Sequence, residues 1–124
     1  MNLVDSCGWM EYFCNTRRAR YFASAIEDLD SLVVPSVCIY EVFRKILTDV
    51  GEQEALQAAA TMRSGRVLSF DDSIAISAAL ISRQYKIPMA DSIIVASART
   101  ADATIWTQDI HFEKLPGVKF FPTK

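Results

Sequence analysis

Short apolar segments alternate with longer helical patterns along this chain, and that alternation restricts its fold more than any other feature. The apolar segments lie at residues 2–4, 32–34, 66–70, 103–107 and 118–121. No two-residue hairpin turn joins any adjacent pair of them. Because parallel strands need long and usually helical connections, the pattern predicts an α/β fold. We expect a three-layer α/β/α arrangement in which helices flank a small, mainly parallel sheet of about five strands.

The remaining segments have the spacing and the end signals of helices. Five of them cover residues 7–15, 16–28, 36–50, 52–63 and 89–101, and another runs from a cap at Asp71 or Asp72 to Ile87-Pro88. Thr16 and Ser36 are expected to cap the second and third helices. The last helix contains almost only small or apolar residues, so we expect it to be buried nearly all round. The two central helices form a hairpin whose wide apolar face suggests a protein partner.

The composition is typical of one globular domain spanning residues 1–124. Of the 124 residues, 51% are hydrophobic and 23% are charged, and the net charge is −2. The chain is therefore not a basic nucleic-acid coat, and RNA binding would require a local basic patch or metal ions. It opens with no signal peptide and has no apolar run of the roughly 18 residues that a membrane span needs. A cytoplasmic protein without a membrane segment is expected.

The cysteines Cys7, Cys14 and Cys38 are odd in number and show no CxxC spacing. This pattern argues against a disulfide framework or a zinc site, and it fits a reducing compartment. We therefore expect three buried, apolar thiols.

Acidic residues follow two of the predicted strands and begin or enter two of the helices. Asp5 follows the first strand, Asp109 follows the fourth, Asp91 opens the buried helix, and Glu41 lies one turn into the third helix. Because ligands of parallel sheets bind beyond the carboxyl ends of the strands, these acids should gather at one edge. Each also has a simpler role, as a helix cap for Asp5 and Asp109, a helix-dipole partner for Asp91, or a solvated side chain for Glu41.

Four carboxylates at one edge would repel one another, and without a cation at least one would stay protonated. Mg²⁺ or Mn²⁺ would neutralise them, since both ions prefer carboxylate and water ligands. Ser6 and Thr107 place hydroxyl groups beside the two strand-end acids. The single histidine, His111, lies in the loop after Asp109, and we interpret it as a surface residue in preference to a general base.

Four segments carry a resemblance to a known family: NLVDSCGW, VPSVCIYEVFRK, PMADSIIVASA and TIWTQDIHFE. In this order and spacing they resemble the PIN-domain ribonucleases, in particular the VapC-type toxins of toxin–antitoxin pairs. The resemblance spans essentially the whole chain and implies metal-dependent cleavage of an RNA phosphodiester.

The resemblance also implies roles for the individual residues. Asp5 and Asp91 would be direct Mg²⁺ ligands, and Asp109 would bind a metal ion or its water. Glu41 would orient the attacking water, while Ser6 and Thr107 would support the acids. A separate antitoxin chain and a homodimer are the implied protein partners. Candidate contacts to RNA phosphates are Arg17, Arg18, Arg44, Lys45 and Arg99, although the arginines near residue 18 could equally form a solvated face.

Two other functions remain open. A signalling receiver domain has a similar fold and would use Asp71 or Asp72 as its phosphate acceptor. However, receivers usually carry an acidic pair after the first strand, and their late lysine is missing from a strand end, because Lys119 lies inside the last strand. A non-catalytic binding module would use the apolar hairpin from Ile39 to Met62 and would gain nothing from clustered acids.

Overall fold

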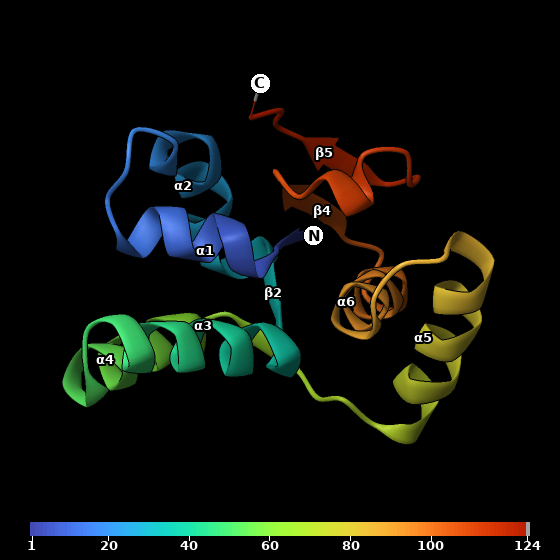
Figure 1. Ribbon diagram of the computed structural model, residues 1–124, viewed down its shortest axis with the longest axis horizontal. Helices are drawn as coiled ribbons and strands as arrows, with labels where there is room; N and C mark the ends of the chain where they lie inside the picture. The colour runs from blue at the N-terminus through green and yellow to red at the C-terminus, as the bar shows by residue number, and fades with distance from the viewer. Residues whose placement is uncertain (124) are drawn as a thin grey trace.

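The computed structural model describes residues 1–123 and contains one five-stranded sheet (Figure 1). The strands are β1 (Asn2–Val4), β2 (Leu32–Pro35), β3 (Arg66–Leu68), β4 (Thr104–Thr107) and β5 (Val118–Phe120). Their order is β3-β2-β1-β4-β5, and every pair is parallel. The α/β prediction is confirmed, including the number of strands.

Within residues 1–123, six α-helices connect and flank these strands. They are α1 (Ser6–Phe13), α2 (Ala19–Glu27), α3 (Ser36–Asp49), α4 (Glu52–Met62), α5 (Asp72–Tyr85) and α6 (Met89–Thr100). Two short 3₁₀ helices, η1 (Leu29–Ser31) and η2 (Ile110–Phe112), complete the set. Helix α1 packs on α2 and α3, α3 pairs with α4, and α5 pairs with α6.

The strand order places a switch point between β1 and β4. From β1 the chain builds outward through β2 to the edge strand β3, and it then returns to the other side of β1 with β4 and β5. The connections leaving β1 and β4 therefore diverge at their carboxyl ends, where open parallel sheets bind ligands. Asp5 and Asp109 follow these two strands.

The core confirms the prediction for the last helix. In α6 the run from Ser92 to Ala98 is buried without interruption, and the central strands β1 and β2 contribute Leu3, Val33 and Val34, which are fully buried. Such continuous burial is typical of elements covered on both sides. Among the described residues, no helix is both long and apolar enough to cross a membrane.

The hydroxyl caps predicted for two helices are wrong, whereas the aspartate cap is confirmed. Asp71 accepts a hydrogen bond from the Ile74 N–H at 2.9 Å and begins α5. Ser36 is the first residue of α3, and its Oγ accepts from the backbone N–H of Phe70, in the loop after β3, at 3.2 Å. The Thr16 hydroxyl donates to the Glu11 carboxylate at 2.8 Å and accepts from the Arg18 N–H at 3.2 Å, but α2 begins only at Ala19, so this contact lies in the turn before the helix.

The cysteine prediction holds only in part. Cys38 is buried and Cys7 is partly buried, but Cys14 is exposed. Cys14 follows the last residue of α1, where the chain turns away from the core, so its thiol lies at the surface. All three thiols are free.

Candidate functional site

Asp5 follows the last residue of β1, caps α1, and accepts hydrogen bonds from three donors. Its Oδ1 accepts from the Gly8 N–H at 3.2 Å and from the Cys7 thiol at 2.7 Å. Its Oδ2 accepts from the Thr107 hydroxyl at 2.5 Å. Asp5 is only 3% exposed. The cap role predicted for Asp5 is thus real, and it orients the carboxylate without excluding a cation.

Thr107 connects the ends of the two central strands. Besides donating to Asp5, its hydroxyl accepts from the Asp109 N–H at 2.9 Å. Because Thr107 is fully buried, this one hydroxyl sets the positions of both strand-end acids.

The close approach of α1 to β1 depends on glycine. A Cβ on Gly8 would lie 2.6 Å from both Val4 Cγ1 and Phe22 Cδ1, far inside van der Waals contact. Gly8 therefore lets the first turn of α1 reach Asp5 while α2 packs behind it.

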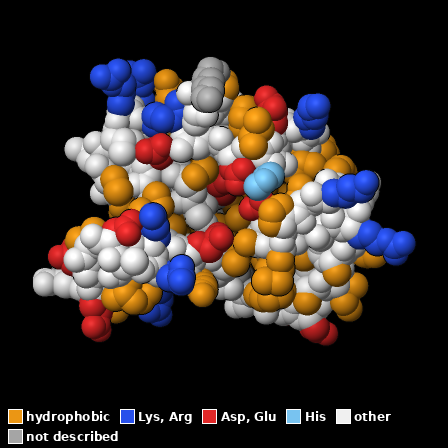
Figure 2. All heavy atoms as spheres, in the orientation of Figure 1, with side chains coloured by type: hydrophobic (Ala, Val, Ile, Leu, Met, Phe, Trp, Pro, Cys, Tyr) orange, Lys and Arg blue, Asp and Glu red, His pale blue; other side chains and the backbone are white. Residues whose placement is uncertain are grey.

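Asp91, Asp109 and His111 form the open part of the site. His111 Nδ1 lies 2.9 Å from Asp91 Oδ2 and 3.2 Å from Asp109 Oδ1. The acids are largely buried and the imidazole is about half exposed, since the side-chain exposures are 14% for Asp91, 31% for Asp109 and 52% for His111. Figure 2 shows the pale blue histidine beside red acidic side chains near the centre of this face. His111 is exposed, as predicted for a surface residue, but its ring also faces two of the acids, which the sequence did not indicate.

Glu41 reaches the same rim from α3. Its Oε1 accepts from the Ser6 hydroxyl at 2.5 Å, so the residue after Asp5 holds the fourth acid. Arg44 and Lys45 join Glu41 in lining a surface hollow of about 500 Å³. The structure thus places Asp91 beside Asp109, connects Asp5 to the Asp109 backbone through Thr107, and pairs Glu41 with Ser6.

Burial and the charges of neighbouring acids raise the pKa values of Asp5 and Asp91. Burial raises the pKa of Asp5 to about 6, hydrogen bonds from Cys7, Thr107 and Gly8 oppose that rise, and the charge of Asp109 adds to it. Burial also raises the pKa of Asp91 to about 6; the charge of Asp109 raises it further, whereas His111 lowers it. A divalent cation bound among these carboxylates would stabilise their ionised forms and so oppose the rise in their pKa values.

The donor set fits such a cation. One ligand atom from each of Asp91, Asp109 and His111 lies within 4.8 Å of the others. Carboxylate oxygens are the preferred ligands of Mg²⁺ and Mn²⁺. The Thr107 hydroxyl connects the Asp5 carboxylate to the backbone N–H of Asp109. The negative charges of Asp5 and Glu41 also raise the pKa of Asp91.

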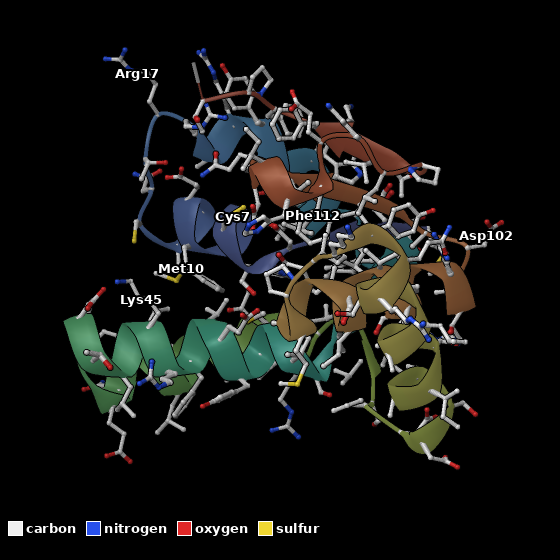
Figure 3. All side chains as sticks on the ribbon, turned by 45° about the vertical axis from the view of Figure 1, so that its right-hand side comes forward. Cys7, Met10, Arg17, Lys45, Asp102 and Phe112 are labelled. Atoms are coloured by element: carbon white, nitrogen blue, oxygen red, sulfur yellow. The ribbon has the colours of Figure 1, made fainter. Side chains whose placement is uncertain are left out.

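The structure also reveals contacts that the sequence did not indicate. The thiol of Cys7, which is labelled in Figure 3 and is partly buried, donates to Asp5. Arg18 Nε donates to Gln108 at 2.5 Å, and Gln108 in turn donates to Glu11 at 2.7 Å. Arg18 is therefore engaged within the protein, whereas Arg17 projects outward from the turn before α2 (Figure 3). No local signal predicts such a chain, because its members are far apart in sequence.

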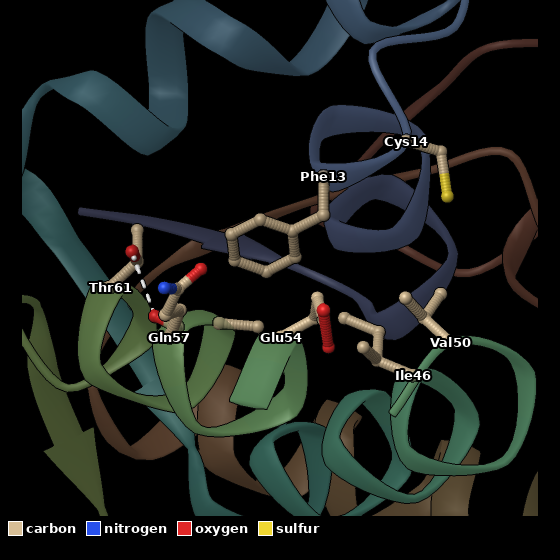
Figure 4. A pocket seen from close by; sticks show the side chains of 8 residues that line it. Phe13, Cys14, Ile46, Val50, Glu54, Gln57 and Thr61 are labelled. Atoms are coloured by element: carbon tan, nitrogen blue, oxygen red, sulfur yellow. Dashed lines mark hydrogen bonds between the residues drawn. The ribbon is translucent and has the colours of Figure 1, made fainter. Parts of the chain in front are cut away.

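An apolar groove lies apart from the acids, between the end of α1 and the α3–α4 hairpin (Figure 4). Its volume is about 430 Å³. It is lined by Phe13, Cys14, Ile46, Val50, Glu54, Gln57, Ala58 and Thr61. The apolar face expected on the helical hairpin is thus part of a concave surface.

Comparisons with known proteins agree with this architecture. The sequence model of the PIN domain matches residues 3–118. No curated protein sequence gives a significant match.

Several solved structures share the fold. A chain of a toxin–antitoxin complex from Klebsiella pneumoniae is 20% identical with a TM-score of 0.79, over 98% of this chain and 99% of that one. Mycobacterium tuberculosis VapC20, described as a sarcin-ricin loop cleaving toxin, is 17% identical with a TM-score of 0.81, over 98% and 100%. FitAcB from Neisseria gonorrhoeae is 18% identical with a TM-score of 0.74, over 98% of both chains.

Proposed function

Because this chain belongs to the PIN-domain family, we propose that it is a metal-dependent endoribonuclease acting as the toxin of a toxin–antitoxin pair. The observation that carries the proposal is the meeting of Asp5, Asp91 and Asp109 at the switch point between β1 and β4, with Glu41 at the rim. Residues 1–124 would act as one domain in the cytoplasm.

Asp5, Asp91 and Asp109 would hold Mg²⁺ or Mn²⁺. A divalent ion bound there would supply an activated water and stabilise negative charge on the phosphate under attack. The Thr107 hydroxyl donates to Asp5 and accepts from the Asp109 N–H, and these two bonds hold Asp5 and the Asp109 backbone in place relative to each other. Glu41, held by Ser6, has lone pairs left to orient the attacking water.

The RNA substrate would be bound by local positive charge, since the chain as a whole is slightly acidic. Arg44 and Lys45 share a hollow with Glu41, so a phosphate bound there would lie close to the acids. Arg17 and Arg99 are exposed and could contact more distant phosphates. Arg18 is a weaker candidate because Gln108 and the Phe121 carbonyl accept its N–H groups.

The antitoxin would cover the apolar groove of Figure 4, with an apolar segment that contacts Phe13, Ile46 and Val50. The Klebsiella pneumoniae neighbour was solved as a toxin–antitoxin complex, which supports a protein partner of this kind. A homodimer could bury Ile76 and Leu80, which lie one turn apart on α5 and are 66% and 67% exposed.

The receiver alternative loses its support. Asp71 caps α5 after the edge strand β3, two strands away from β1. The family match is likewise to the PIN domain. The non-catalytic binding module remains as the competing outcome of the test.

The test is cleavage of a mixed RNA substrate by purified protein with Mg²⁺ or Mn²⁺. Asp91→Asn should reduce the rate by more than about 100-fold, because even outer-shell partners of metal ligands contribute 10–100-fold. Asp72→Asn is the matched control, since Asp72 is exposed, lies on α5 and has no part in the site. Equal cleavage by Asp91→Asn and wild type would refute the assigned site. Absence of metal-dependent cleavage in the wild type would favour the binding module.

A further inference from the structure

The only histidine of the chain faces the acid pair formed by Asp91 and Asp109. The same nitrogen, Nδ1, is within 3.2 Å of an oxygen of each acid. Asp91 comes from α6, whereas Asp109 caps η2 and His111 lies within it, so the imidazole connects two segments that are distant in sequence.

The local structure holds the imidazole in this place. Asp109 Oδ1 accepts from the His111 backbone N–H at 2.9 Å and thereby caps the single turn of η2. The next residue, Phe112, is fully buried and anchors the turn in the core, whereas Ile110 points to solvent with 71% exposure. Between these two, the side chain of His111 is directed back toward the acids.

The two distances from the imidazole nitrogen to the carboxylate oxygens suit ligands of one ion. Two adjacent ligands of an octahedral ion with bonds of about 2.1 Å are about 3 Å apart. The distances from Nδ1 to the two carboxylate oxygens, 2.9 and 3.2 Å, match that separation. An imidazole nitrogen can donate a proton to carboxylates or a lone pair to a metal ion, so the same position serves either role.

We infer that His111 is a further protein ligand of the proposed metal ion, beside Asp91 and Asp109, and that it gives this centre a preference for Mn²⁺ and later transition metals over Mg²⁺. The inference rests on the proposed metal site. It follows from ligand chemistry, because imidazole favours transition-metal ions while an all-carboxylate site accepts Mg²⁺ equally well.

The experiment measures ion binding directly, without RNA. The full chain is titrated with Mn²⁺ and, separately, with Mg²⁺, and pulsed electron paramagnetic resonance of the Mn²⁺ complex detects nitrogen bound to the ion. The variants are His111→Gln, with Glu113→Gln as a matched surface control from the same loop and Asp91→Asn as the variant that removes the carboxylate site. Wild-type Mn²⁺ should show the nitrogen coupling, and His111→Gln should lose it with an affinity about 10-fold weaker. Mg²⁺ affinity should change little.

Each other result overturns the inference. Mn²⁺ bound without nitrogen coupling, but lost in Asp91→Asn, would make His111 a hydrogen-bonding neighbour and leave the proposed nuclease intact. Equal losses of Mg²⁺ and Mn²⁺ affinity in His111→Gln would reject the preference for transition metals. If the wild type binds neither ion, both the inference and the proposed metal site fail, and the RNA cleavage assay then shows independently whether any nuclease activity remains.

Discussion

Replacing Asp5 with Asn is expected to stabilise the metal-free protein at neutral pH, even though it removes a proposed ligand. Asp5 is buried, and burial raises its pKa from 3.8 to about 6. The folded protein therefore binds this proton more tightly than the unfolded chain does. The stability that the proton contributes is fully present below about pH 4 and is lost as the pH rises through 6.

The magnitude follows from the two pKa values. A rise from 3.8 to about 6 corresponds to about 3 kcal/mol, at 1.36 kcal/mol per pH unit. Asn is neutral at every pH and keeps an oxygen that can accept from Gly8 and Cys7. Its amide N–H₂ group faces the Thr107 hydroxyl, which must turn to accept, and this rearrangement reduces the gain. We expect Asp5→Asn to be more stable than wild type by about 1–3 kcal/mol at pH 7.5.

Urea unfolding in EDTA at pH 7.5 and pH 4 measures this difference. The advantage of Asp5→Asn should shrink by most of its value at pH 4, where the wild-type carboxyl is protonated. Asp72→Asn, at an exposed position, should show no such pH-dependent gain. If Asp5→Asn is destabilised equally at both pH values, burial does not raise the pKa of Asp5 and the electrostatic reasoning is refuted.

Three further predictions concern the ion, the strand link and the packing. Mn²⁺ at a hundredfold excess over its Kd should stabilise wild type by about 2.7 kcal/mol in thermal unfolding but leave Asp91→Asn unchanged; an equal rise in both would place the ion elsewhere. Thr107→Val removes the donor to Asp5 and the acceptor of the Asp109 N–H, so urea unfolding should show a loss of about 1–3 kcal/mol. An unchanged midpoint would mean that other groups or water replace the hydroxyl. Gly8→Ala places a Cβ 2.6 Å from neighbouring side chains of β1 and α2 and should cost about 1–3 kcal/mol by the same measurement; a neutral effect would show that α2 can shift.

Local patterns in the sequence determined the elements and the places of the acids along them. The apolar strand before Asp5, the buried helix that Asp91 opens and an aspartate cap at position 71 or 72 were all predicted, since periodicity and capping act within a few residues. The convergence of the acids at one edge was predicted as well, because parallel strands end on the same side of a sheet. The hydroxyl caps at Thr16 and Ser36 were not correct, because α2 begins three residues after Thr16 and because the fold brings the Phe70 N–H to the Ser36 hydroxyl.

Only the tertiary structure decided which of those residues touch. The strand order β3-β2-β1-β4-β5 puts β1 beside β4, and this pairing lets the Thr107 hydroxyl reach Asp5 across 102 positions of sequence. The orientation of His111 depends on the burial of Phe112 and on the placement of α6 beside β4. No spacing rule encodes such contacts, because they arise from strand register and from packing between distant segments. The sequence by itself therefore determined which carboxylates could form a site, and the three-dimensional packing decided that an imidazole joins them.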